Sequence, residues 1–236
     1  MTAVMSTLGS AAFFDLDRTL IAFNSGMRYA RWEHRNKRLS TLQLAQSGVW
    51  MALYHLSLID MTKAFERAVA FYRGQSAAVI DERTRAWFAS EIEAHILPAA
   101  RAAIAEHRAA GRPIVLLSST SSWMATVVSE RWGFDAWLAN VFPHDARGLL
   151  TGEVVKPLCY GPGKVEHARR WAEAHRVDLR ESWFYSDSHS DVPMLAAVGH
   201  PVVVNPDPRL RGVARRRGWP VVDWRTAEPG TRMDGR

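Results

Sequence analysis

The sequence predicts an α/β fold in which a doubly wound parallel sheet carries an inserted, all-helical segment. Short apolar runs that end in small polar or acidic residues alternate with stretches of helical periodicity, which is typical of a parallel sheet covered on both faces. Such sheets bind ligands at the carboxyl ends of their strands. The expected strands cover residues 12–14, 114–117, 183–185, 201–204 and 221–224, and the expected helices include residues 99–110, 123–132 and 165–175.

The alternation is interrupted between residues 25 and 93, where no strand-like run occurs and Trp, Arg and Ala are frequent. A helical insert between the first and second strands is the simplest explanation. We therefore expect a core built from residues 1–24 and 95–236 and a cap built from residues 25–94. Pro98 begins the next core helix, because proline is favoured in the first helical turn.

The composition is that of a globular protein, with 47% hydrophobic and 23% charged residues in a chain of 236. The net charge of +6 suits phosphate esters, nucleic acid or a membrane surface and does not choose among them. The single cysteine, Cys159, excludes an internal disulfide and fits a reducing compartment. The sequence shows no signal peptide, and we expect a cytoplasmic protein.

Two carboxylates follow the first expected strand. The segment FFDLDRTL (13–20) places Asp15 and Asp17 two positions apart, so alternation along an extended chain points both to the same side. Two like charges about 4 Å apart repel by roughly 4 kcal/mol at an effective dielectric constant near 20, so the pair calls for a nearby cation. By itself the motif is more typical of a solvated turn.

A second pair of acids follows the strand expected at residues 183–185. Asp187 and Asp191 lie in YSDSHSDVPML (185–195), and Asp191 stands where a helix would begin, a favourable place for a carboxylate. Acids from two strand ends can converge on one hard cation. Magnesium fits, because it binds one or two carboxylates, waters and a substrate phosphate.

Two further features suit an anion. Ser118 closes the run PIVLL and opens a Ser/Thr cluster through Ser122, and hydroxyl and N–H groups at a strand-to-helix junction bind anions or cap the following helix. Lys164 follows two glycines in GPGKVEHARR (161–170). Alone, such a lysine is more often a solvated surface group.

These four pieces, in this order and at these strand ends, resemble the motifs of the haloacid dehalogenase (HAD) superfamily. The long helical insert and the ending DVPMLAAVGHPVVVNPDPRLRGVARRRGWPV (191–221) resemble its subfamily IB, which is phosphoserine-phosphatase-like. The resemblance covers nearly the whole chain. It implies a Rossmann-like core with an inserted helical cap of the C1 type, and a Mg²⁺-dependent phosphomonoester hydrolase that works through an aspartyl-phosphate on a small organic phosphate.

The resemblance also implies a role for each motif residue. Asp15 would be the nucleophile, and Asp17 the general acid that protonates the leaving alcohol and later the base that activates water. Ser118 would bind a phosphoryl oxygen, and Lys164 would neutralise Asp15 and the phosphoryl charge. The implied metal residues are Asp15, Asp17 through its backbone carbonyl, Asp187 and Asp191, and the implied supporting residues are Thr19 and Ser188.

The sequence departs from phosphoserine phosphatases at one informative position. Those enzymes carry a glutamate nine residues after the nucleophile to hold the substrate's ammonium group, and here that position is Asn24. The sequence therefore does not support free phosphoserine as the substrate, whereas all the motif residues that the phosphatase reaction requires are present. Substrate choice would rest with the cap. The candidate substrate-binding residues are Ser119, Asn24, Arg28 and Arg31.

Three alternatives stay open at this stage. Residues 39–59 contain no charge, so the apolar segment 42–59 is either the cap's own core or a site for a lipid-like phosphate with peripheral membrane contact through the cap. A phosphonatase would need a buried cap lysine, and nothing marks Lys37 or Lys63 as one. A basic binding module could use the arginines of residues 209–217, but aromatic interleaving is lacking and we expect no nucleic-acid partner. The sequence does not indicate an oligomeric state.

Overall fold

A single six-stranded parallel sheet organises the chain. The computed structural model describes residues 8–46, 49, 65–66, 69–70 and 72–226. The strand order is β3-β2-β1-β4-β5-β6, which confirms the predicted α/β, doubly wound class. The strands are β1 (Ala12–Phe14), β2 (Ile114–Ser121), β3 (Ala136–Asn140), β4 (Trp183–Ser186), β5 (His200–Val204) and β6 (Val221–Val222).

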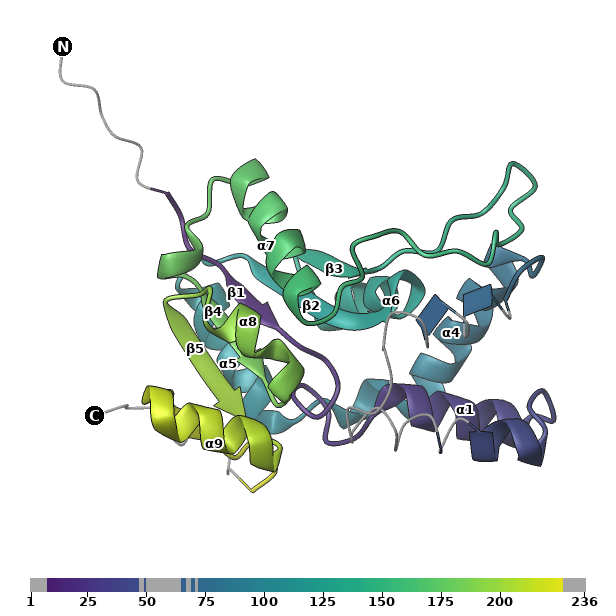
Figure 1. Ribbon diagram of the computed structural model, residues 1–236, viewed down its shortest axis with the longest axis horizontal. Helices are drawn as coiled ribbons and strands as arrows, with labels where there is room; N and C mark the ends of the chain where they lie inside the picture. Colours follow the sequence, from purple (N-terminus) through teal and green to yellow (C-terminus); the bar gives the residue numbers. More distant parts are fainter. Residues whose placement is uncertain (1–7, 47–48, 50–64, 67–68, 71, 227–236) are drawn as a thin grey trace, which may run out of the picture.

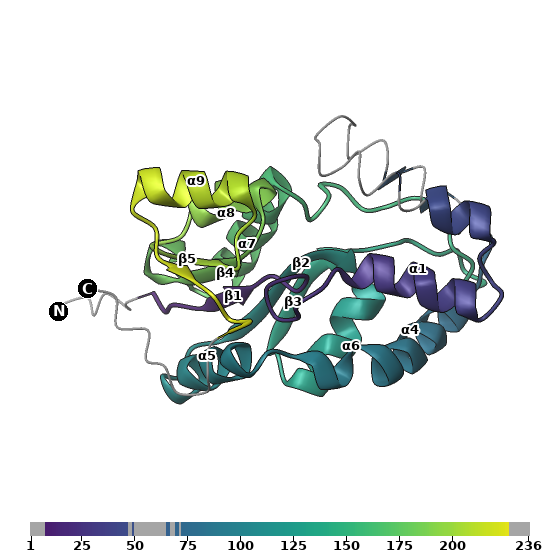
Figure 2. The same cartoon turned by 90° about the horizontal axis from the view of Figure 1, so that it is seen from below.

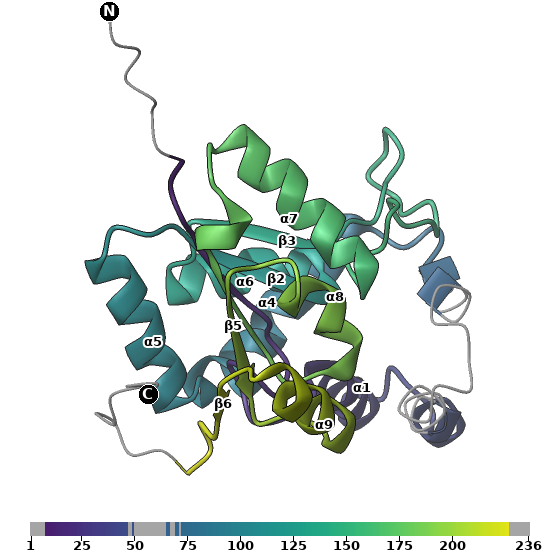
Figure 3. The ribbon, with the colours of Figure 1, turned by 60° about the vertical axis from the view of Figure 1, so that its left-hand side comes forward.

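Helices cover both faces of this sheet (Figures 1 and 2). On one face lie α5 (Pro98–Ala109) and α6 (Ser122–Trp132), and on the other lie α7 (Pro162–Ala174), α8 (Val192–Leu195) and α9 (Pro208–Arg217). Figure 3 shows the same layers from another side. Successive side chains of a strand point to opposite faces. Accordingly Phe13 makes an edge contact with Trp171 of α7, with ring centroids 5.6 Å apart, whereas Phe14 contacts His107 of α5 at 6.0 Å.

Between β1 and β2 the described residues include several helices and no strand of the sheet. They include α1 (Ser25–Arg35), a helical stretch at residues 41–46, α4 (Ala77–Glu91) and the short η1 (Glu93–His95). α1 lies beyond the carboxyl end of β1 and packs near α4 (Figures 1 and 2), with the rings of Tyr29 and Trp87 5.0 Å apart. The boundaries of the cap, 25–94, stay a prediction.

The structure adds detail that the sequence analysis lacked. β3 was not expected, and β2 continues through the Ser/Thr cluster to Ser121, with a register shift against β3 between Leu117 and Ser121. The N-cap of α6 is therefore Ser121, whose hydroxyl accepts from the Met124 N–H. Most of the apolar segment 42–59 lies outside the described residues. Among the residues that are described, no helix is long and apolar enough to span a bilayer.

The register of the central strands sets the place of the site. Phe14 is opposite Leu116 of β2 and Tyr185 of β4. The residues that follow, Asp15, Ser118 and Asp187, therefore emerge at one edge from strands about 4.8 Å apart. The chain first builds β2 and β3 on one side of β1 and then returns to build β4 on the other. Ligands bind at such a switch point, outside the carboxyl ends of the strands.

Gly163, in the first turn of α7, makes a close backbone approach that we expect to be essential for stability. A Cβ atom there would lie 1.9 Å from the carbonyl oxygen of Leu158. Gly163→Ala should therefore lower the free energy of unfolding by about 1–3 kcal/mol. Gly212, inside α9, is the matched control, because its added Cβ would meet the Arg216 guanidinium at an ordinary 3.5 Å. Gly212→Ala should raise the free energy of unfolding by about 0.5–1 kcal/mol. Urea denaturation of both variants tests this, and equal effects would contradict it.

Candidate active site

A buried lysine connects acids from two separate strand ends. Lys164 Nζ donates to Asp15 Oδ1 at 2.8 Å and to Asp191 Oδ2 at 2.7 Å. The side chains of Lys164, Asp15 and Asp191 are only 2%, 9% and 1% exposed. Water therefore screens these charges little, and the ion pairs are stronger than they would be at the surface.

The local sequence explains why Lys164 reaches this position. α7 begins at Pro162, and the missing side chain of Gly163 lets its first turn lie against the Leu158 carbonyl. Asp15 follows Phe13 by two positions and so faces the side of the sheet that α7 covers. The ammonium group also lies 5.6 Å from the centroid of the Phe184 ring, which provides an apolar wall.

The loop after β4 holds the second pair of acids. Ser186 Oγ donates to Asp191 Oδ2 at 2.7 Å, while Asp191 Oδ1 is buried and has no hydrogen-bond partner among the described residues. The carbonyl of Asp187 accepts from the Asp207 N–H at 3.0 Å, and the Asp207 carboxylate accepts from the His189 N–H at 2.8 Å. The loop after β5 thus fixes the loop that carries Asp187.

The electrostatics of the cluster show an excess of negative charge. Burial raises the pKa of Asp15 to about 7, with Lys164 opposing the rise and Asp191 adding to it. Burial raises the pKa of Asp187 to about 8, and the charges of Asp15 and Asp191 add to the rise. For Lys164, burial lowers the pKa, but the two neighbouring carboxylates outweigh it and the net pKa is raised. Lys164 bonds two of these buried acids, and the charge of Arg18 also opposes the rise at Asp187. The donors that the acids present are oxygens, which suit a hard metal ion.

Asp17 is held by a different set of groups. Its Oδ2 accepts from Asn24 Nδ2 at 3.0 Å and its Oδ1 from the Ser25 N–H at 2.9 Å. Burial raises the pKa of Asp17, and hydrogen bonds from Ser25 oppose the rise. Asn24 Oδ1 accepts from the Met27 N–H at 2.9 Å and caps α1. Both ends of the Asn24 amide therefore make contacts within the protein, and its role in substrate binding stays a prediction.

The remaining predicted substrate and phosphate residues are placed as follows. Ser118 is buried in β2, one residue beyond the level of Asp15. Ser119 is half-buried, and its carbonyl accepts from Asn140 Nδ2 at 2.7 Å. Arg28 pairs with Glu91 at 3.0 Å and lies 4.4 Å from the Phe23 ring centroid, and Glu91 also pairs with Arg35. Arg31 is exposed on α1.

The two supporting residues differ in how they are bound. Ser188 Oγ accepts from the Ser190 N–H at 3.3 Å and caps the short helix η3 (His189–Asp191). Thr19 is buried in the first loop, but its hydroxyl has no hydrogen-bond partner among the described residues. Any bracing by Thr19 thus comes from packing and its backbone, whose N–H approaches the Leu16 carbonyl at 3.4 Å.

Three further polar residues, which were not predicted from the sequence, support the site. Asn205, with φ of 45°, donates through Nδ2 to the Arg18 carbonyl at 3.3 Å and so ties the β5 loop to the first loop. Asp207 holds the loop of Asp187, and Ser186 holds Asp191, as described above. The segment Asn205-Pro206-Asp207-Pro208 carried a signal, since Asp followed by Pro is a strong helix start.

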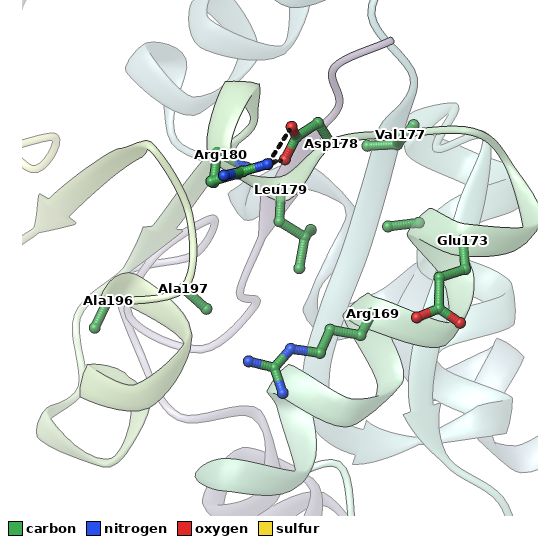
Figure 4. Close-up of a pocket in the computed structure, with 9 residues that line it drawn as sticks. Arg169, Glu173, Val177, Asp178, Leu179, Arg180, Ala196 and Ala197 are labelled. Carbon is green, nitrogen blue, oxygen red and sulfur yellow. Dashed lines mark hydrogen bonds and ion pairs between the residues drawn. The ribbon is translucent and has the colours of Figure 1, made fainter. Parts of the chain in front are cut away.

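A separate hollow of about 520 Å³ lies between α7 and α8 and contains none of these acids (Figure 4). Its lining includes Arg169, Asp178 and Arg180. Asp178 and Arg180 come just before β4 and form an ion pair at 3.4 Å. The hollow is therefore at the amino ends of the strands, opposite the edge where Asp15 emerges, and does not belong to the candidate active site.

Comparison with protein families agrees with this geometry. Residues 12–196 match the model of the haloacid dehalogenase-like hydrolases. The chain belongs to this HAD family. The match includes all four motifs, from Asp15 to Asp191, and confirms the resemblance found in the sequence.

Relatives of this HAD hydrolase include named phosphatases. Phosphoserine phosphatase SerB1 of Mycobacterium tuberculosis is 30% identical over 96% of this chain and 74% of its own length. Histidinol-phosphatase of Neisseria meningitidis is 28% identical over 91% of this chain and 98% of its own length. With the family match, these relatives place the chain among the phosphoric monoester hydrolases.

Solved structures of HAD proteins share the fold. A protein of unknown function from Bordetella pertussis superposes with a TM-score of 0.84 at 27% identity, covering 92% of this chain and all of its own. A phosphoserine phosphatase solved as a phospho-aspartyl intermediate analogue superposes with a TM-score of 0.66 at 16% identity, over 87% of this chain and 91% of its own. At that identity, the second likeness concerns the fold alone.

The raised pKa values predict how the stability of the metal-free protein depends on pH. Between about pH 6.5 and 8.5, Asp15 and Asp187 retain protons in the folded state that the unfolded chain, with an Asp pKa near 3.9, has already released. The folded state binds more protons, so the free energy of unfolding should fall as pH rises through this window. His107, whose pKa burial lowers to about 4, opposes this trend at the acid end of the window, because the unfolded imidazole, with a pKa near 6.5, is still half protonated there. Above about pH 7.5 His107 is neutral in both states.

Urea denaturation in a chelator at several pH values between these limits measures the slope. Asp187→Asn should flatten it. Asp178→Asn, which removes an acid whose pKa its hydrogen bonds with Arg180 lower, should leave it unchanged. A free energy of unfolding that rises with pH in the wild type would contradict the assignment.

Proposed function

We propose that this HAD hydrolase is a Mg²⁺-dependent phosphomonoesterase in which Asp15 carries the phosphoryl group as an aspartyl-phosphate. The observation that supports this most directly is the buried Lys164, bonded to Asp15 and Asp191 at the switch point of the sheet. Such an ammonium group lowers the repulsion between an attacking carboxylate and an anionic phosphate ester. An ion pair that served only the protein surface would be exposed to water, whereas Lys164 and its two partners are buried.

The reaction follows from the two aspartates. A carboxylate oxygen of Asp15 forms a bond to phosphorus while the bond from phosphorus to the alcohol oxygen breaks, and the carboxyl group of Asp17 gives its proton to that leaving oxygen. A water molecule then attacks phosphorus, and the Asp17 carboxylate takes a proton from it. The bond to Asp15 breaks, which releases inorganic phosphate and restores the Asp15 carboxylate. One slow hydrolysis thus becomes two easier steps.

The residues of the site fit a magnesium ion, which HAD phosphatases generally use. Asp191 Oδ1 is buried and has no hydrogen-bond partner among the described residues, and burial raises the pKa values of Asp15 and Asp187. Asp15, Asp187 and the backbone carbonyl of Asp17 would hold the ion, with Asp191 in support. No closed cage of three His, Cys, Asp or Glu side chains occurs in the part of the chain that the structure describes. Magnesium does not need one, because it keeps waters and binds substrate phosphate. When bound, it supplies positive charge that stabilises the phosphoryl group.

For the substrate we propose a small organic phosphate monoester that need not carry an ammonium group. Asn24 stands where phosphoserine phosphatases have an acid, and its amide is engaged by Asp17 and the Met27 N–H. The histidinol-phosphatase relative makes other amino alcohol phosphates suitable members of a test panel. The lipid-phosphate alternative rests on the segment 42–59, most of which the structure does not describe. Membership in a hydrolase family speaks against a basic binding module as the main function.

We also propose a cytoplasmic location. The only cysteine, Cys159, is buried, and burial raises the pKa of its thiol to about 12, so it stays a protonated, unreactive thiol. A free, buried thiol is compatible with a reducing compartment.

Replacing the nucleophile tests the proposed chemistry. Asp15→Asn keeps the shape of the side chain but removes the attacking carboxylate, so phosphate release from p-nitrophenyl phosphate should fall at least about a thousandfold. Asp145→Asn, at an exposed position of the loop between β3 and α7, is the control and should retain wild-type activity. A purified Asp15→Asn variant that turns over at a rate near that of the wild type would overturn the proposal.

Magnesium should stabilise the protein in a pH-dependent manner. The ion competes with protons for Asp15 and Asp187, whose pKa values are raised to about 7 and 8. Millimolar Mg²⁺ should therefore raise the melting temperature more at pH 8.5 than at pH 6.5. Asp187→Asn should lose most of this increase. Differential scanning fluorimetry measures it, and an increase that is the same at both pH values and in the variant would contradict the metal site.

A further inference from the structure

The carboxyl group of Asp17 is held by the first residues of the cap helix α1. Asn24 Nδ2 and the Ser25 N–H each donate to one of its oxygens, at 3.0 Å and 2.9 Å, and the Ser25 side chain also hydrogen-bonds this carboxyl group. The segment between Asp17 and Asn24 folds back on itself, because the Arg18 N–H donates to the Phe23 carbonyl at 3.2 Å and the Leu16 carbonyl accepts from the Ile21 N–H at 3.2 Å. The orientation of the carboxyl group is thus set by the point where the chain enters α1.

The side-chain amide of Asn24 makes a hydrogen bond at each of its two ends. Its Oδ1 accepts from the Met27 N–H and caps α1, while its Nδ2 donates to Asp17. Rotating the amide would break both contacts at once, so the start of α1 and the Asp17 carboxyl group are fixed relative to each other. Each carboxyl oxygen has two lone pairs, so these donors leave room for a proton on Asp17.

We propose that Asn24 is a positioning residue for the general acid and that it aims the Asp17 carboxyl group at the leaving oxygen. This inference rests on the proposed function and deepens it, since it assigns position 24 to proton transfer in place of substrate recognition. An acidic residue there would put a second carboxylate about 3 Å from Asp17, where two negative charges repel each other.

Dependence on the leaving group separates this role from a general structural one. An alkyl alcohol is a poor leaving group and needs a proton when its bond to phosphorus breaks. The p-nitrophenolate ion leaves without a proton. A misaligned Asp17 should therefore slow the hydrolysis of alkyl phosphates selectively, whereas a damaged fold or a displaced Asp15 would slow both.

The test compares kcat/KM for glycerol phosphate and p-nitrophenyl phosphate in the presence of Mg²⁺. Asn24→Ser keeps an N-cap oxygen, but its hydroxyl ends one bond short of the amide nitrogen and cannot serve both contacts. We expect kcat/KM to fall about tenfold for glycerol phosphate and less than about twofold for p-nitrophenyl phosphate. Asn24→Asp, which keeps the cap and turns the donor into an acid, should lower the ratio of the two values further.

Asn36→Ser is the matched control, because Asn36 Nδ2 donates to the Trp32 carbonyl at 2.8 Å at the other end of α1 and does not touch Asp17. Its ratio of kcat/KM values should equal that of the wild type. An unchanged ratio in both Asn24 variants, or an equal loss on both esters, would overturn the role of Asn24 and leave the proposed function standing. A wild-type protein without Mg²⁺-dependent hydrolysis, or an active Asp15→Asn, would overturn the proposed function and this inference with it.

Discussion

The site depends on one buried ammonium group placed between two carboxylates. A charge in the protein interior is costly unless it is paired, and Lys164 is paired twice, with Asp15 and Asp191. The pairing also stabilises the rest of the cluster, because without the lysine Asp15 and Asp191 would lose the ammonium group that they share. The sheet, the first turn of α7 and the close approach at Gly163 all contribute to holding this one group in place.

Five of the six strands and the acids that follow two of them could be predicted from the sequence, because local patterns indicate both. Asp15 and Asp187 follow short apolar runs, and such runs are recognisable without any knowledge of distant contacts. Lys164 is different. It lies 149 positions from Asp15, and a single lysine after glycines gives no local sign of burial. Its role could be anticipated only through the resemblance of the whole set of motifs to a family.

Other details escaped because tertiary contacts override local preference. The segment Ala136–Asn140 reads AWLAN and has no β-branched residue, yet it forms the edge strand β3 beside β2. The Ser/Thr cluster, expected at a junction, is drawn into β2 by pairing between Ser121 and Asn140. Asn140 also bonds the Ser119 carbonyl and the Cys159 N–H, at 2.7 Å and 2.9 Å. No sequence pattern indicates such hydrogen bonds between segments that are far apart in the chain.

Position 24 combines two structural requirements, a cap for α1 and a donor for Asp17. An N-cap needs an acceptor, and Ser, Thr, Asp and Asn all supply one. Among these residues, only Asn combines a separate, outward amide donor with the capping oxygen and adds no charge. At position 24 the helix requires the acceptor, and the neighbouring Asp17 is best served by an uncharged donor. Asparagine satisfies both requirements, so under the proposed mechanism the absence of an acid at position 24 follows from the placement of Asp17 as well as from the chemistry of the substrate.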